Sequence, residues 1–139
     1  MKLSKGFSLL ELLVALFILS IGLLGVIPLA ITTIRLNAFQ NQMLNAKYLA
    51  ERQAEYLRSI SFDSQDLAND GDDNDLDNTA IPDHIITRVM DGVTYNILWN
   101  IAENADGTKT VNIIVQWTFN PTGQVKIYNV TFVRSRYEI

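Results

Sequence analysis

The densest group of possible metal ligands in this chain is a run of Asp and Asn residues near its middle. Within this run Asp73, Asp75 and Asp77 occupy alternate positions, a spacing that lets a loop wrap carboxylates around calcium, a hard cation that prefers oxygen ligands. The match to an EF-hand loop is partial, because Asn78 replaces its glycine and His84 replaces its distal glutamate. Two interpretations stay open: a calcium site and a solvated acidic loop.

A second residue with chemical potential is Glu11, which stands in front of an uncharged stretch from Leu12 to Ile34. That stretch is longer than the roughly 20 helical residues that cross a bilayer core. A charge inside such a helix costs roughly 2.5 to 3.5 kcal/mol on insertion scales unless it is paired. Glu11 therefore either has a partner of opposite charge or lies at the level of the lipid headgroups.

The flanks of the apolar stretch suggest how it is oriented. Lys2 and Lys5 precede it and Arg35 follows it, which favours a cytoplasmic N-terminus and a chain that is mostly outside the cytoplasm. An ordinary secretory signal fits poorly, because its apolar region is roughly 7 to 15 residues long and ends at a small-residue cleavage site. We therefore predict a single-pass anchor.

The start of the apolar stretch carries a family resemblance in one hexapeptide, Gly6-Phe7-Ser8-Leu9-Leu10-Glu11. It resembles the N-terminus of type IV pilins and pseudopilins. The resemblance implies that a prepilin peptidase and methyltransferase cleaves between Gly6 and Phe7 and methylates the new amine of Phe7. It also implies that Glu11 docks the subunit among other pilins or pseudopilins.

Cleavage would create an ammonium group at Phe7, and in an apolar helix bundle such a charge is tolerated mainly when it is paired. Glu11 is the nearest candidate partner. It can pair with the amine of its own chain or with that of the next subunit, and only the resemblance favours the second. Further along the same helix, Gly22, Gly25 and Pro28 predict a softened or bent turn, since proline removes one helical hydrogen bond. The resemblance adds local unwinding at Pro28 on assembly, while a static kink is the alternative.

Ser8-Leu9-Leu10-Glu11 is followed by an apolar run that contains Ser20-Ile21-Gly22-Leu23-Leu24-Gly25. Within the family, this start most resembles the PilV-type minor pilins, also called type IV pilus modification proteins. Their roles are in pilus biogenesis, adhesion or motility. Minor pseudopilins of type II secretion have similar starts, so they are the first alternative. The location implied is the bacterial inner membrane, followed by a pilus or pseudopilus. A third alternative, from another class, is a membrane-tethered calcium-binding module.

Composition narrows the function further. Removal of residues 1–6 takes away Lys2 and Lys5 and lowers the formal net charge from −4 to −6. An acidic domain argues against nucleic acid as a main ligand, and we interpret Arg134 and Arg136 as solvated charges on a terminal strand. The chain has no cysteine, so it departs from relatives that close a C-terminal loop with a disulfide. No set of nucleophile, base and orienting group is recognisable, and we predict no enzyme.

The elements that must position these residues follow from periodicity. Residues 35–60 keep apolar positions at helical spacing, and residues 61–83 are rich in Asp, Asn and Gly and predict a loop. Four segments then have the composition and alternation of strands: Ile85 to Met90, Val93 to Ile101, Thr110 to Phe119 and Gln124 to Val133.

Short turns between these segments predict an antiparallel meander, with Asp91-Gly92 as a two-residue hairpin. The predicted fold is α+β and pilin-like, with a long N-terminal helix packed on a four-stranded antiparallel sheet. The predicted parts are a leader (1–6), a transmembrane and assembly helix (7–34) and an extracytoplasmic globular domain (35–139).

Overall fold

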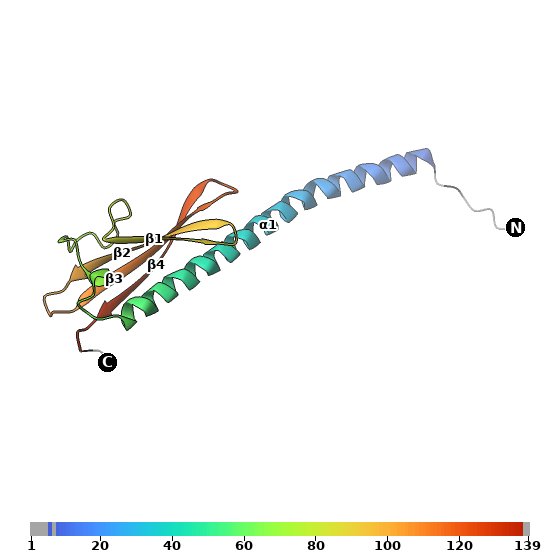
Figure 1. The fold of residues 1–139 in the computed structure, drawn as a ribbon. Coiled ribbons are helices and arrows are strands. Elements are labelled where there is room, and N and C mark those ends of the chain that lie inside the picture. Colours follow the sequence, from blue (N-terminus) through green and yellow to red (C-terminus); the bar gives the residue numbers. More distant parts are fainter. Residues whose placement is uncertain (1–5, 7, 138–139) are drawn as a thin grey trace. The chain divides into compact units, whose positions relative to one another are not determined.

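A computed structural model of the chain describes residue 6 and residues 8–137. Its long helix and four strands confirm the predicted α+β class (Figure 1). The elements in chain order are α1 (Leu9–Ser59), the short 3-10 helix η1 (Gln65–Leu67), β1 (His84–Met90), β2 (Val93–Glu103), β3 (Lys109–Phe119) and β4 (Gln124–Arg134). The chain divides into two compact units, one up to Ala38 and one from Phe39 onward.

The first unit contains the apolar part of α1. This part is long and apolar enough to cross a membrane, and its large apolar side chains are exposed rather than buried within the chain. Pro28 lies inside the helix, and the hydroxyl of Thr32 donates a hydrogen bond to the Pro28 carbonyl at 2.9 Å. Apart from the adjacent backbone of α1, a Cβ atom at Gly22 or Gly25 would have no described atom within 4 Å, so packing against the described residues does not require glycine there.

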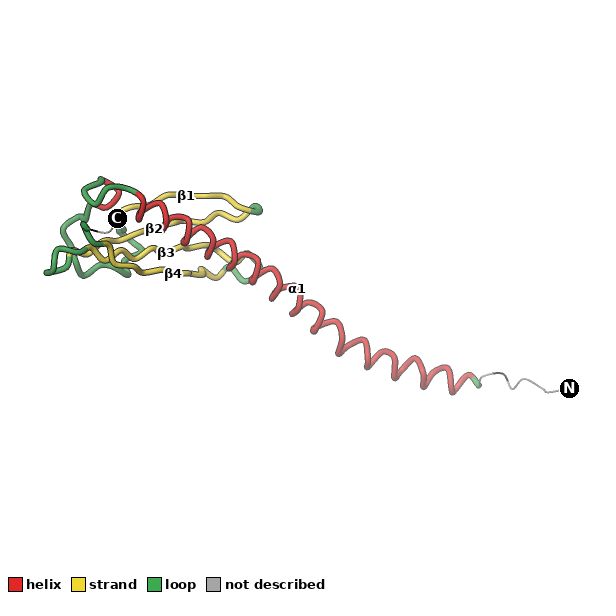
Figure 2. Tube along the Cα trace, turned by 90° about the horizontal axis from the view of Figure 1, so that it is seen from below, coloured by secondary structure: helices red, strands yellow, loops and turns green. Residues whose placement is uncertain are grey.

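In the second unit the remainder of α1 is amphipathic and lies along one face of the sheet (Figure 2). Its buried residues recur every three or four positions, as expected for a helix with one covered stripe. They are Ala46, Leu49, Ala50, Gln53, Ala54 and Leu57. The three alanines allow the helix to approach the sheet closely. The predicted amphipathic helix from residue 35 is thus confirmed, and it ends at Ser59.

The sheet is an antiparallel meander in the order β1-β2-β3-β4, as predicted. The turn between β1 and β2 has positive φ at both Asp91 (51°) and Gly92 (73°), the backbone that a tight two-residue hairpin requires. The central register places Ile97 opposite Val115, which fixes the faces to which all other side chains point.

One face of the sheet forms the core with α1. Its side chains come from alternate strand positions, including Tyr95, Trp99, Ile113 and Trp117, and all four are buried. The opposite face carries Leu98, Asn100, Asn112 and Ile114, which are also buried. Part of this second face is therefore covered, and its asparagines are bonded to the loop after η1.

The prediction of two solvated arginines near the C-terminus is half wrong. Arg136 is exposed and pairs with Asp63 at 3.0 Å. Arg134 is buried, because its guanidinium donates hydrogen bonds to the carbonyls of Leu57, Arg58 and Ile60 at the end of α1. These carbonyls lack partners within the helix and carry the negative end of its dipole, so a cation is the group that suits them.

Candidate functional site

The predicted processing and assembly residues lie at the start of α1. Gly6 and Glu11 are exposed, and Phe7 is outside the described residues. The backbone N–H of Glu11 donates to the hydroxyl of Ser8 at 3.4 Å, and Leu12 N–H donates to the Ser8 carbonyl at 3.1 Å. Ser8 therefore caps the helix, with Glu11 three residues later as in a capping box. The carboxylate thus lies in the first turn, near the positive end of the helix dipole.

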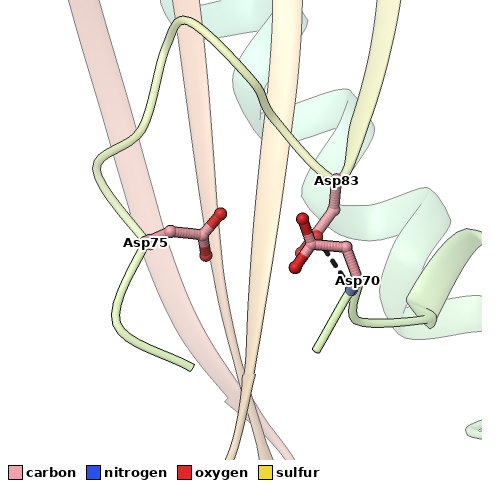
Figure 3. A group of neighbouring side chains, drawn as sticks. All are labelled: Asp70, Asp75 and Asp83. Carbon is pink, nitrogen blue, oxygen red and sulfur yellow. Dashed lines mark hydrogen bonds between the residues drawn. The ribbon is translucent and has the colours of Figure 1, made fainter. Parts of the chain in front are cut away.

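The acidic loop brings three carboxylates together: those of Asp70, Asp75 and Asp83 (Figure 3). One oxygen of each lies within 4.8 Å of the others. Of the predicted calcium ligands Asp73, Asp75 and Asp77, only Asp75 belongs to this cluster.

The other two predicted ligands bind protein groups instead. Asp73 Oδ1 accepts hydrogen bonds from the side-chain amide of Asn69 at 2.6 Å and from the backbone N–H of Glu103 at 2.7 Å. Asp77 Oδ1 accepts one from the side chain of Asn112 at 3.1 Å. Both carboxylates are exposed and help hold the loop against the sheet.

Two buried asparagines of the sheet explain why the loop folds back over it. Asn100 is fully buried, and its amide nitrogen lies 2.8 to 3.2 Å from the carbonyl oxygens of Asp75, Leu76 and Asn78. Asn112, its cross-strand neighbour, donates to the Leu76 carbonyl at 2.8 Å. A buried amide is costly unless it is bonded, so these contacts both satisfy the asparagines and anchor the loop.

Asp83 ties the end of the loop to the same region. Its Oδ2 accepts the Ile101 N–H at 2.7 Å and its Oδ1 accepts the Asp70 N–H at 3.0 Å. Its own N–H donates to Asn100 Oδ1 at 2.9 Å. These bonds place Asp70 and Asp83 side by side although they are far apart in sequence. Sequence spacing could not reveal this pairing, because it depends on contacts with β2.

The electrostatics of the cluster are unfavourable without a cation. Asp75 Oδ1 is buried and has no hydrogen-bond partner among the described residues. Burial raises the pKa of Asp75, and the negative charges of Asp83, Asp70 and Asp72 raise it further. Three oxygens that converge on a place where negative charge is disfavoured can hold a hard cation such as calcium, which binds carboxylate and carbonyl oxygens.

His84 has a structural role. It is the first residue of β1, as expected for a strand-edge residue, and its ring stacks on Trp99 with centroids 5.1 Å apart. Its Nε2 lies 2.9 Å from the carbonyl oxygen of Ala68. A carbonyl oxygen only accepts, so this contact requires the tautomer with a proton on Nε2. The ring therefore holds the loop after η1 against the first strand.

The geometry defines a class of protein: a membrane-length helix with a capped start, continued into a helix-on-sheet unit of pilin-like architecture. Comparison with known families agrees with this class. The prokaryotic N-terminal methylation motif matches residues 1–27, so the chain carries the N-terminal signal of the type IV pilin family. That signal confirms the resemblance found in the sequence, and it implies a type IV pilin-like or pseudopilin protein of a structural family. No curated protein and no solved structure is significantly similar to the chain.

Proposed function

We propose that this chain is a structural minor subunit of a type IV pilus, of the PilV type, with a role in pilus biogenesis, adhesion or motility. The observation that carries the proposal is the methylation motif at residues 1–27, which extends into a helix that begins at Leu9 and can cross a membrane. The pilin-like unit from Phe39 onward supports it. Before assembly, the subunit lies in the bacterial inner membrane with its N-terminus in the cytoplasm. It then enters the filament.

In the proposed mechanism, cleavage creates a positive charge at Phe7 and Glu11 supplies the negative charge that pairs with it. A prepilin peptidase cleaves between Gly6 and Phe7, and methylation of the new amine keeps its positive charge. Glu11 lies in the first turn of α1. Within a bundle of apolar helices, its carboxylate and the amine of Phe7 are tolerated mainly as a pair of opposite charges. Pairing between neighbouring subunits fixes their axial register.

The intact mass and N-terminal sequence of the protein from native membranes test the processing step. The expected product begins with N-methylated Phe7 and lacks residues 1–6. A chain that still begins with Met1, in cells whose prepilin peptidase is active, would contradict the proposal and favour a tethered domain. Gly6→Leu is the matched variant, because it changes the cleavage site alone and should leave the chain uncut.

A minor pseudopilin of a type II secretion system is the second candidate, because the methylation motif serves both systems. Genes beside this one distinguish the two. Pilus assembly factors would support the pilus, and a secretin with secretion partners would support the pseudopilus.

We further propose that the acidic loop binds calcium through Asp70, Asp75 and Asp83. The convergence of their oxygens within 4.8 Å and the unbonded, buried Asp75 Oδ1 support this proposal. The chain then combines assembly through its helix with a loop stabilised by a cation. The melting temperature of the mature chain with added calcium and with chelator tests it.

A further inference from the structure

A groove runs between α1 and the edge strand β1, on the face of the sheet that α1 covers. Its volume is about 330 Å³, within the range of protein ligand sites. Its walls and floor are mostly apolar or aromatic, with contributions from Leu49, Tyr56, Ile86, Ile97 and Trp99. The groove is therefore suited to apolar side chains that enter beside β1.

Positive charge lines this groove. Arg52 and Arg88 contribute to its walls, and neither has a carboxylate within ion-pair distance among the described residues. The one carboxylate in its lining, Asp66, accepts a hydrogen bond from the Tyr56 hydroxyl at 2.7 Å. Two free guanidinium groups beside an apolar floor favour a ligand that carries both carboxylates and apolar groups.

The groove on the other side of α1, beside β4, has a different charge. Glu51 and Glu55 lie in its lining together with Arg58. Arg58 is engaged, because its guanidinium lies 4.6 Å from the centre of the Phe132 ring. The two sides of α1 therefore differ in charge, and only the β1 side complements an acidic partner.

The sheet edge beside the groove that Arg52 and Arg88 line is available for pairing with a further strand. Within residues 8–137, β1 is a terminal strand of the sheet and pairs only with β2. Its seven residues include no proline, and Arg88 is the one Lys, Arg, Asp or Glu among them. Proteins usually protect exposed edges with several such residues or with a covering segment, so an edge strand with a single charged residue is a candidate for β-augmentation.

We propose that an extended acidic segment of a neighbouring filament subunit, different from this chain, adds to the free edge of β1. Its apolar side chains fill the groove beside Trp99, and its carboxylates pair with Arg52 and Arg88. The inference rests on the proposed function, because a filament supplies such a neighbour. Its test needs no filament, so its failure leaves the proposed function untouched.

The test uses the full mature chain in detergent with a probe attached. A peptide of about seven alternating Glu and Val residues follows Ile139 through a flexible Gly/Ser linker of about 20 residues, with a span of roughly 25 Å. Such a tether gives an effective concentration in the millimolar range, so even weak binding is detected. Backbone amide exchange in β1 should slow by about tenfold relative to the same chain with a Lys/Val peptide.

Charge reversal supplies the matched control. Arg52→Glu combined with Arg88→Glu should abolish the protection by the Glu/Val peptide and transfer it to the Lys/Val peptide. Lys126→Glu, on the opposite edge strand, should change neither result. Equal exchange in β1 with both peptides, or protection in β4 instead, would overturn the proposal. Protection of β1 that rises with the concentration of the chain without a peptide would assign the edge to a second copy, and would overturn it as well.

Discussion

The Asp75 carboxylate should destabilise the loop when no cation is present and bind calcium when it is. Burial and three neighbouring aspartates raise its pKa, so the folded chain binds the Asp75 proton more tightly than the unfolded chain. Its contribution to stability is therefore present below the ordinary pKa of Asp and is lost as the pH rises through the raised value. At neutral pH without calcium, ionised Asp75 lowers the free energy of unfolding.

Asp75→Asn should therefore raise the melting temperature of the calcium-free mature chain at neutral pH. The neutral amide removes the repulsion and can donate to Asp70 or Asp83. The difference from wild type should shrink as the pH falls through the raised pKa of Asp75 toward the ordinary pKa of Asp. Asp72→Asn, a nearby exposed carboxylate, is the control and should have a smaller effect. An equal or lower melting temperature for Asp75→Asn at neutral pH would contradict this account.

Calcium should stabilise the wild-type chain, and this stabilisation should require the Asp75 carboxylate. A ligand that binds only the folded state adds about 2.7 kcal/mol to the free energy of unfolding when its concentration is about 100 times its dissociation constant. The melting temperature of the wild-type chain should rise with calcium and fall with chelator, and Asp75→Asn should lose most of this response. An unchanged melting temperature of the wild type would reject the calcium proposal.

The acidic loop also shows how far the sequence leads at the scale of residues. Composition identified the loop and its Asp cluster, and Asp75 was among the predicted ligands. Asp70 and Asp83 were missed because hydrogen bonds with Ile101 and Asn100 place Asp83, and the Asp70 N–H donates to Asp83. Asp73 and Asp77, which match the alternating pattern, lie against Glu103 and Asn112 instead. The spacing of residues in the sequence describes a loop without its surroundings, whereas the conformation of this loop depends on its hydrogen bonds to the sheet.

At the scale of elements, Arg134 connects the last strand to the end of the long helix. Its guanidinium has no carboxylate partner among the described residues, and α1 carbonyls take that place. The sequence could not show this, because a single arginine at a strand end is usually solvated. The strands were more predictable, because the alternation of apolar and polar residues and the Asp91-Gly92 turn depend on residues that are close in the sequence.

Arg134→Met should lower the free energy of unfolding by about 2 to 3 kcal/mol, because it removes charged hydrogen bonds and leaves helix carbonyls without partners. Urea unfolding followed by tryptophan fluorescence measures this. Arg136→Met is the matched control, since its exposed pair with Asp63 should contribute less than about 1 kcal/mol. Equal effects of the two substitutions would mean that Arg134 does not anchor the helix end.

The loop anchor gives a second prediction for the elements. Asn100→Leu removes the amide that joins the loop to β2 and should cost about 1 to 3 kcal/mol, since the loop carbonyls lose their partner. Proteolysis within residues 68–83 should become faster, while amide exchange in β3 stays slow. Thr87→Leu, an exposed residue of β1 on the same face, is the control and should leave the loop protected. Unchanged proteolysis of Asn100→Leu would show that other contacts hold the loop.

At the scale of the whole molecule, the chain divides into two compact units, and the proposed assembly residue lies outside the unit that contains the sheet. The unit from Phe39 onward has its own core, built from Leu57, Trp99 and Ile113 among others. Glu11 belongs to the other unit and is exposed there. A change at Glu11 should therefore affect contacts between subunits without altering the packing on the sheet.

Glu11→Ala should leave membrane insertion, removal of residues 1–6 and the unfolding of the sheet unchanged, and should strongly reduce incorporation into filaments. An unpaired ammonium among apolar helices costs several kcal/mol, which is enough to exclude most of the variant. The measurement is the fraction of the subunit in sheared filaments relative to the membrane, compared with Ser20→Ala, a change on the same exposed helix that removes no charge. Glu11→Asp, which keeps the charge on a shorter side chain, should recover part of the incorporation. Normal incorporation of Glu11→Ala would contradict the charge pairing. A loss of stability in the unit from Phe39 onward would contradict the independence of its packing from Glu11.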